Sequence, residues 1–305
     1  MKMIRISLIL LFASVGAVFG QTPDIQTVLA KRLALEKRTV LEDGKRVSKT
    51  GIALDEICDL SDPVAARVFK EYGAMWVGKG DTFASFKQGI TGNSIRFLAN
   101  CVFEDETQVA LYHSNIATKS ATIGGVAIEL QAGAMDALIA AREEAGNRGI
   151  AITPRGGPTA AKRTFDDTLR LWKSRYLPGL DHWVGRGKIS RADADASRQM
   201  PIRSQVAQVL AWESKGYFFS KDLSKSILYS VAAPGASQHV FMLALDVEQF
   251  SNPQVRAILA KHGWFQTVKS DLPHFTYLGV AESELPALGL EAVTVGGQKF
   301  WIPKL

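Results

Sequence analysis

The chain has 305 residues, of which 47% are hydrophobic and 22% are charged, and its formal net charge is +6. This composition is typical of a globular protein with a buried core, and it excludes a disordered, collagen-like or polytopic membrane protein. The 36 basic and 30 acidic residues are mixed, with no dense run of Lys or Arg, so the charge gives no reason to expect a nucleic acid partner.

The first twenty residues have the layout of a secretory signal peptide. Lys2 and Arg5 precede the apolar run 6–12, and the stretch ends with the small residue Gly20. The apolar part is short for a membrane span. We therefore expect residues 1–20 to be removed, which would leave a secreted or periplasmic protein without a stable membrane span. An uncleaved anchor is the alternative.

Export would place the two cysteines, Cys58 and Cys101, in an oxidising compartment. An isolated pair there favours a structural disulfide, which stabilises a protein by about 2–4 kcal/mol. The alternatives are two buried thiols or half of a metal site, although no C-x-x-C spacing indicates redox or zinc chemistry. Both cysteines belong to an N-terminal region, 21–124, that includes a charged stretch with helical spacing over 24–48.

From about residue 125 the apolar pattern predicts a series of elements. Two predicted helices, 134–144 and 164–176, have apolar residues on one side, and two more, 204–215 and 253–261, each end before a glycine. The predicted strands cover 126–130, 150–152, 240–247, 275–278, 292–295 and 298–302, the last two around a Gly-Gly turn. The polar stretch 178–200 predicts a long surface loop. Because there is no regular βαβ rhythm, we expect an α+β fold with a small, mainly antiparallel sheet and flanking helices, preceded by an N-terminal region of unknown fold.

Two of the five histidines lie in contexts that indicate a metal site. Asp246 follows His239 by seven residues, and Asp271 precedes His274 by three. Two imidazoles and one carboxylate form a ligand set suited to catalytic zinc, with the fourth position left for water. Asp271 could accept a proton from that water. The alternative is two buried histidines and two surface aspartates.

Strand geometry sets a condition on this site. On one continuous strand, His239 and Asp246 would face opposite sides, so they can share an ion only if the chain turns between them. A Pro-Gly pair just upstream indicates that His239 still belongs to a loop. A proline before His274 disfavours helical spacing, so a bend must bring Asp271 round to it.

The segment Ser237–Asp246, S-Q-H-V-F-M-L-A-L-D, resembles the S-x-H-x-x-G-x-A-x-D signature of the zinc D-alanyl-D-alanine carboxypeptidases. This family includes the vancomycin-resistance-type carboxypeptidases and has the hedgehog/D-Ala-D-Ala peptidase fold. Residues 271–279 are similar to its later E-x-x-H motif and continue the match. The resemblance covers roughly residues 125–305, and it implies a zinc peptidase domain there. It says nothing about residues 21–124, which could cap the cleft or bind cell wall.

The resemblance also implies roles for individual residues. The ligands of Zn would be the residues that match the family's ligand positions: His239, Asp246 and His274. Asp271 would be the general base, although it is one methylene shorter than the family's Glu. Met242 stands where the family has Gly, and we expect its thioether to crowd the site.

Residues 150–156 are similar to a family strand that ends in S-G-Y-R-S, whose Arg binds the terminal carboxylate of the substrate. Arg155 is therefore the candidate for this role, because a planar guanidinium suits a carboxylate. The alternative is a solvated loop arginine, since S-G-Y is absent here. Ser237 would bind substrate or support a metal ligand.

The function that the resemblance implies is that of an exported zinc metallopeptidase that acts on peptidoglycan stem peptides and removes the terminal D-Ala. One alternative is an endopeptidase with the same zinc site. A site that requires a free carboxylate beside Arg155 would reject internal peptide bonds, so such a requirement would exclude the endopeptidase. Another is a cell-wall binding module that retains zinc without turnover. The last is a structural envelope domain without a metal.

Overall fold

The computed structural model describes residues 63–76, 103, 105–114 and 116–304. The predicted signal peptide, the charged stretch 24–48, and both Cys58 and Cys101 lie outside the described residues. Among the described residues, no helix combines the length and the apolar composition needed to cross a membrane.

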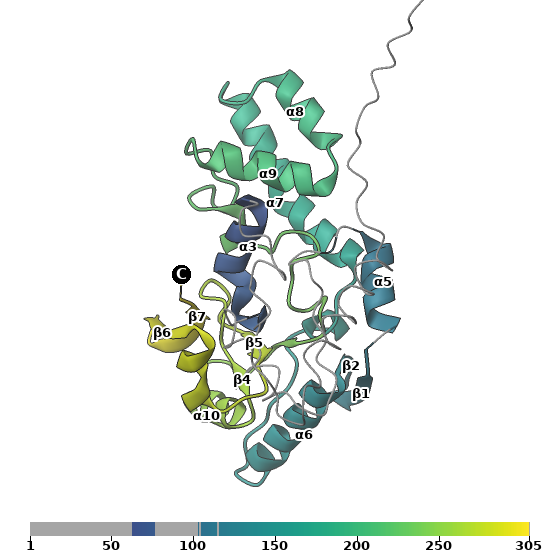
Figure 1. Ribbon diagram of the computed structural model, residues 1–305, viewed down its shortest axis with the longest axis vertical. Coiled ribbons are helices and arrows are strands. Elements are labelled where there is room, and N and C mark those ends of the chain that lie inside the picture. Colours follow the sequence, from purple (N-terminus) through teal and green to yellow (C-terminus); the bar gives the residue numbers. More distant parts are fainter. Residues whose placement is uncertain (1–62, 77–102, 104, 115, 305) are drawn as a thin grey trace, which may run out of the picture.

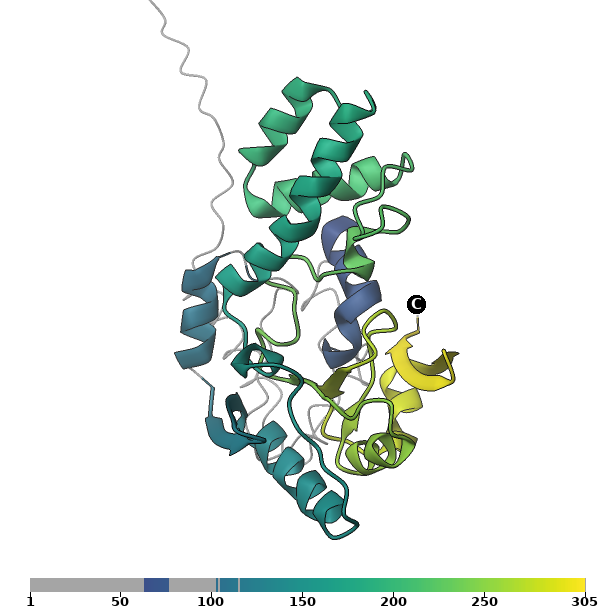
Figure 2. The ribbon, with the colours of Figure 1, turned by 180° about the vertical axis from the view of Figure 1, so that it is seen from behind.

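The described chain forms two lobes arranged along the long axis of the molecule (Figure 1). The helical lobe consists of three helices, which are α7 (Phe165–Gly185), α8 (Arg191–Arg198) and α9 (Ile202–Glu213). The sheet lobe contains the strands, together with helices α6 (Ala132–Gly146) and α10 (Pro253–Lys261). Helix α3 (Pro63–Tyr72) contacts α9 in one lobe and β7 in the other, so it links the two, as the view from behind in Figure 2 shows.

A three-stranded antiparallel sheet lies at the centre of the sheet lobe, in the order β3-β5-β4. Its strands are short: β3 (Ala244–Asp246), β4 (Trp264–Phe265) and β5 (His274–Tyr277). Asp246 pairs directly with His274 across β3 and β5. Side chains of directly opposed residues lie on the same face of a sheet, about 5 Å apart at Cβ. The register therefore brings these two predicted ligands together.

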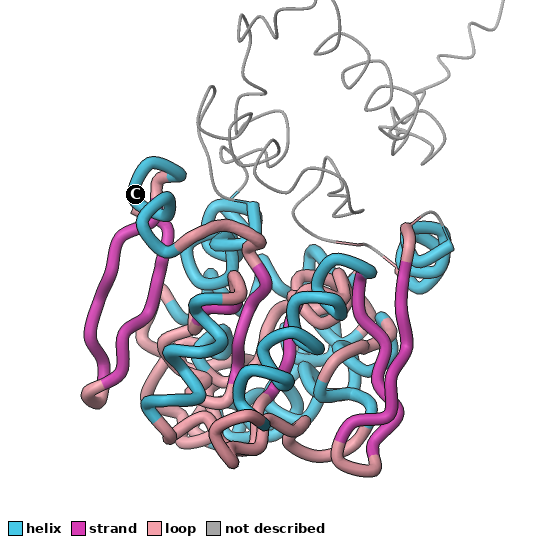
Figure 3. Tube along the Cα trace, turned by 90° about the horizontal axis from the view of Figure 1, so that it is seen from below, coloured by secondary structure: helices cyan, strands magenta, loops and turns pink. Residues whose placement is uncertain are grey.

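Two hairpins lie on opposite sides of the central strands (Figure 3). One joins β1 (Thr118–Ile123) to β2 (Val126–Gln131), and the other joins β6 (Leu290–Val295) to β7 (Gln298–Pro303). Both turn on a Gly-Gly pair with positive φ at each glycine, as a two-residue hairpin turn requires. The predicted C-terminal hairpin is confirmed.

The remaining described elements are short: α5 (Glu106–Ser114) and the 3₁₀ helices η1 (Gly73–Trp76), η2 (Pro158–Ala160), η3 (Ile227–Tyr229) and η4 (Glu282–Leu288). The α+β class is confirmed, because helices surround small antiparallel sheets. The four predicted helices are confirmed, with ends that differ from the expectation by a few residues except at the end of α7.

The predicted loop over 178–200 is wrong, because α7 continues to Gly185 and α8 follows it. Pro178 and Gly179 resemble a helix stop, yet both lie inside α7. A tertiary contact explains why the helix continues. A Cβ on Gly179 would lie 2.5 Å from the ring of Phe219, so only a glycine at this position lets the ring pack against the helix. The ring is fully buried in the core of the helical lobe, and that burial offsets the poor helix propensity of the pair.

Two other strand predictions are wrong in part. Only Ala244–Asp246 of the predicted strand 240–247 is a strand, because the chain turns over 237–243. The segment 150–152 forms no strand, although Pro154 just after it makes an isolated bridge to Val247. Two backbone hydrogen bonds close this bridge, from the N–H of Arg155 to the carbonyl of Asp246 at 2.8 Å and from the N–H of Glu248 to the carbonyl of Thr153 at 2.9 Å.

Candidate metal centre

Tight turns place His239 on the same side as Asp246. The N–H of Val240 donates to the carbonyl of Ser237 at 2.9 Å, and that of Met242 donates to the carbonyl of His239 at 3.1 Å. The chain thus turns between His239 and the start of β3, which is the condition that strand geometry had set. The predicted loop position of His239 is confirmed.

Met242 has the left-handed backbone conformation, with φ of 54°. Such a conformation costs an L-residue roughly 1–2 kcal/mol and costs glycine little, which explains why a glycine suits this position of the turn. The Met242 side chain is fully buried in the core of the sheet lobe and does not line the cavity described below. The expected crowding of the site is therefore wrong. Gln131 supports the turn, since its N–H donates to the carbonyl of Met242 and its Nε2 to that of Phe241.

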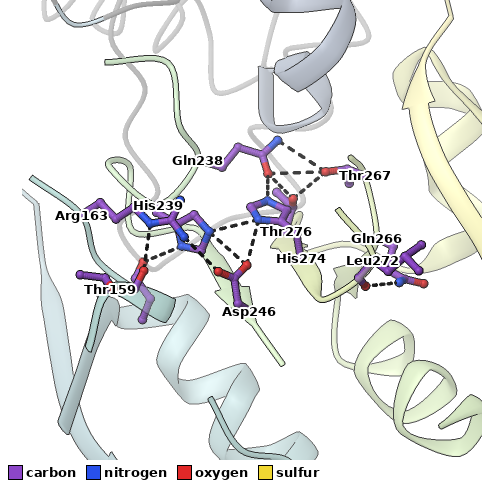
Figure 4. A network of polar contacts seen from close by, with 11 residues as sticks. Thr159, Arg163, Gln238, His239, Asp246, Gln266, Thr267, Leu272, His274 and Thr276 are labelled. Atoms are coloured by element: carbon purple, nitrogen blue, oxygen red, sulfur yellow. Dashed lines mark hydrogen bonds and ion pairs between the residues drawn. The ribbon is translucent and has the colours of Figure 1, made fainter. Parts of the chain in front are cut away.

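Three ligand atoms converge at this point, as Figure 4 shows. Oδ1 of Asp246 lies 3.3 Å from Nε2 of His239 and 3.3 Å from Nδ1 of His274, and the two nitrogens are 3.1 Å apart. Ligands held 2.0–2.1 Å from a tetrahedral ion are separated by about 3.3 Å. The triangle of donor atoms is therefore of the size that one small ion needs, and the group could hold a metal.

The two oxygens of Asp246 have different surroundings. Oδ2 accepts a hydrogen bond from Nη2 of Arg163 at 3.0 Å, whereas Oδ1 is buried and has no hydrogen-bond partner among the described residues. An unsatisfied buried carboxylate oxygen is costly. A cation among the three donor atoms would satisfy it, so the residues present fit a metal ion.

Hydrogen bonds on the far side of each imidazole orient the two histidines. Nδ1 of His239 lies 3.3 Å from the carbonyl of Ala161, and Nε2 of His274 lies 2.7 Å from Oε1 of Gln238. These acceptors assign a proton to each of those nitrogens, which leaves the opposite nitrogen of each ring as a lone-pair donor. Nε2 of Gln238 donates in turn to the carbonyl of Tyr72 at 2.8 Å, which fixes the amide.

The charges of the triad also suit a cation. Burial lowers the pKa of His239 to about 4, and the nearby Arg163 adds to the effect, so the imidazole is neutral at neutral pH. Burial opposes ionisation of Asp246, but His239 and His274 outweigh it and hold the pKa of the carboxyl well below its usual range. The ligand set at neutral pH thus includes a neutral His239 and a carboxylate.

The triad borders a cavity of about 350 Å³ between the two lobes. Its walls come from α7, from the segment after η3, from the turn at 237–239 and from the segment 268–274. Ser237 is buried and lines this cavity, as do His239 and His274. The metal centre therefore faces a space that a small ligand could enter.

Asp271 lines the same cavity. Two consecutive turns place it there: its N–H donates to the carbonyl of Val268 at 3.0 Å, and its own carbonyl accepts from the N–H of His274 at 3.2 Å. The predicted bend is confirmed. Loss of solvent in the cavity raises the pKa of Asp271, with His274 acting in the opposite direction. Because the residue is also exposed, we expect that rise to be modest.

Arg155 does not line the cavity, although the sequence had indicated it as the carboxylate-binding residue. Its backbone N–H donates to the carbonyl of Asp246 at 2.8 Å, and its exposed guanidinium lies 5.3 Å from the centre of the Phe250 ring. Arg163 is the arginine beside the metal ligands, and it lines the cavity. Nε of Arg163 donates to the carbonyl of Thr159 at 3.0 Å, which holds the side chain in place.

Sequence reasoning missed Arg163 and Gln238 for different reasons. Arg163 stands directly before Thr164, the N-cap of α7. A basic residue is unfavourable at the start of a helix, so its presence there could have indicated a functional role. Gln238 occupies a position that the motif leaves open, so only the fold reveals its contact with His274. No protein-family model, curated protein or solved structure matches the chain. The site is therefore defined by its own geometry.

Proposed function

We propose that the chain is an exported zinc peptidase that removes the terminal D-Ala from peptidoglycan stem peptides. The observation that carries the proposal is the convergence of three metal-ligand atoms on a cavity that Asp271 and Arg163 also line. The resemblance of both motifs to the zinc D-Ala-D-Ala carboxypeptidases supports the choice of reaction and substrate.

Zinc is the metal that this ligand set favours. Two imidazole nitrogens and one carboxylate oxygen, with donor separations of 3.1–3.3 Å, suit a tetrahedral ion with one position left for water or substrate. When bound, zinc supplies a Lewis acid that polarises a carbonyl and brings the pKa of bound water to about 7.

Asp271 is the proton-transfer group of the proposal. Among the described residues that line the cavity, it is the acidic one. Its carboxylate accepts a proton from the attacking water and then donates it to the leaving amine. A pKa above that of an ordinary aspartate brings the group closer to the pH at which both transfers are efficient.

Arg163, and not Arg155, is the residue that binds the terminal carboxylate of the substrate in this proposal. Nε and Nη2 of Arg163 hold Thr159 and Asp246, and among the described residues Nη1 donates to no protein group. Because Arg163 lines the cavity, this remaining donor can bind the terminal carboxylate of a peptide next to the metal. Such a contact selects the last peptide bond over an internal one.

The test is mass spectrometry of pentapeptide-bearing muropeptides incubated with the protein, with a zinc chelator and after zinc is restored. We expect loss of one alanine residue that the chelator abolishes and zinc restores. Asp271→Asn should lower kcat by about 100-fold or more without loss of bound zinc. Arg163→Gln should raise KM for peptides with a free terminal carboxylate.

The outcomes separate the alternatives. Cleavage within a stem or cross-bridge would replace the carboxypeptidase by an endopeptidase. Bound zinc without any cleavage would indicate a binding module. Absence of zinc from protein prepared in zinc-containing medium would contradict the metal centre itself.

A further inference from the structure

The cavity extends away from the metal ligands along helix α7. Thr168, Leu171 and Arg175 line it at successive helical spacings of three and four, so they form one stripe on α7. At this end the cavity is also lined by residues 229–232, which begin at the last residue of η3. Arg175 therefore marks a part of the cavity that the proposed chemistry does not use.

Arg175 is held in place by neutral groups. Its Nε donates to Oγ of Ser230 at 3.0 Å, and its Nη1 donates to Oγ of Ser174 at 2.9 Å. Among the described residues, no carboxylate forms an ion pair with this half-buried guanidinium, and its Nη2 donates to no protein group. By contrast, Arg170 on the same helix is paired with Asp167 at 2.9 Å. An oriented but uncompensated guanidinium is suited to an anionic ligand.

The charge of the cavity supports the same conclusion. The described lining residues include two arginines, Arg163 and Arg175, and one aspartate, Asp271. A divalent ion at the triad would add further positive charge. The cavity therefore favours a ligand with more than one negative group.

The position of Arg175 sets how far apart those negative groups lie. Arg163 directly precedes Thr164, the N-cap of α7, and Arg175 stands eleven residues after Thr164. At a rise of 1.5 Å per residue, Arg175 lies about 17 Å along the helix axis from Thr164, the neighbour of Arg163. Extended peptide spans about 3.3 Å per residue, and arginine side chains reach several ångströms, so the second group lies roughly two to five residues from the first.

We propose that Arg175 and Ser230 form a subsite for a second carboxylate of an acidic peptide, upstream of the scissile bond. This inference rests on the proposed peptidase function, because that function places the C-terminal carboxylate at Arg163. The α-carboxylate of a γ-linked D-Glu in a stem peptide is a group of the required chemistry and position. The subsite selects substrates in which this carboxylate is free over those in which it is amidated.

Two matched peptides test the subsite with the zinc-loaded protein. The first is L-Ala-γ-D-Glu-L-Lys-D-Ala-D-Ala with a free α-carboxylate on D-Glu, and the second is the same peptide with an α-carboxamide there. We expect kcat/KM to be about tenfold higher for the acid, mainly through KM. Arg175→Gln should remove this preference, and Arg175→Lys should keep part of it because the charge remains. Arg170→Gln, on the same helix but outside the cavity lining, should retain it.

A binding measurement keeps this result distinct from the peptidase proposal. Calorimetric titration of each peptide into the zinc-loaded protein measures its affinity, and the difference between the two affinities is the contribution of the subsite. Tighter binding of the acid that Arg175→Gln abolishes supports the subsite even when neither peptide is cleaved. Equal kcat/KM for the two peptides, or equal affinity where neither is cleaved, overturns it. If Arg175→Gln lowers the melting temperature, Ser230→Ala, which removes one support of the guanidinium, serves as the second variant and should weaken the preference.

Discussion

The two lobes meet the cavity with different kinds of structure. The sheet lobe presents His239, Asp246 and His274 from a tight turn and two paired strands, with ligand atoms within 3.3 Å of one another. The helical lobe presents half-buried side chains, such as Arg175, from one face of α7. Backbone pairing fixes the ligand positions, whereas the helix face can change residue by residue without moving the metal centre. In the proposed function, the chemistry and the recognition of substrate would thus be carried by separable parts of the fold.

Each lobe also has its own hydrophobic core. The core of the sheet lobe includes Phe241, Met242 and Phe275, and that of the helical lobe includes Trp172 and Phe219. Helix α3 contacts both lobes. If the lobes are energetically distinct, substitutions in one should affect metal binding and substitutions in the other should affect stability or substrate preference. The following experiments test this separation.

Removal of one metal ligand should have the largest effect. We expect Asp246→Ala to lower zinc affinity by a factor on the order of 1000 or more and to abolish zinc-dependent hydrolysis, because it removes the one anionic ligand. Zinc content after dialysis measures the change. Asp181→Ala is the matched control, since Asp181 is paired with Arg198 on the surface of the helical lobe. Equal zinc loss in both variants would contradict the separation.

The metal-free protein should become less stable as the pH falls from about 6.5 to about 4. The folded-state pKa of His239 is about 4, whereas that of an unfolded histidine is about 6.5, so only the unfolded chain binds this proton within that range. The contribution is fully present above pH 6.5, is lost as the pH falls, and amounts to at most about 3 kcal/mol.

Urea denaturation at a series of pH values measures this slope. His239→Gln should reduce it. His113, whose pKa is also lowered by burial, should contribute a slope that remains in the variant. A slope unchanged by His239→Gln would show that His239 is protonated in the folded state at a higher pH than we infer.

Two buried glutamines allow a direct comparison of the lobes. Gln238→Leu removes the acceptor that orients His274, so we expect zinc affinity to fall by about 10–100-fold. Gln205→Leu removes the acceptor of the Trp172 indole N–H, at 2.9 Å in the helical lobe. It should lower the free energy of unfolding by about 1–3 kcal/mol and leave zinc affinity unchanged. A loss of zinc affinity in Gln205→Leu would show that the lobes are coupled.

Two glycines of α7 should give the smallest effects, and of opposite sign. Gly179→Ala gains helix propensity but brings a Cβ within 2.5 Å of the Phe219 ring, so we expect a net loss of about 1 kcal/mol in the free energy of unfolding. Gly185→Ala meets no atom within 4 Å and should stabilise by up to about 1 kcal/mol. Thermal unfolding of both variants measures the difference, and stabilisation by both would show that Phe219 can move aside.

The predictable parts of the molecule are those that local chemistry determines. The Gly-Gly hairpin and the turn at His239 follow from glycine, proline and strand periodicity. The continuation of α7 past Pro178 depends on Phe219, forty residues away, and no local pattern contains that contact. The same holds for Arg163, because its place beside Asp246 exists only after η2, which contacts β3, has folded against that strand.

The direct pairing of Asp246 with His274 links strand register to metal binding. A slip of β3 against β5 by one residue would turn the carboxylate to the other face of the sheet, so an ion binds only the correctly paired strands. A ligand that binds one register and not the others stabilises it by RT ln(1 + [L]/Kd), which is about 4 kcal/mol when the free ion is at 1000 times Kd. If the candidate site binds an ion, the concentration of that ion around the chain would shift the folding equilibrium, and metal depletion would loosen the sheet lobe.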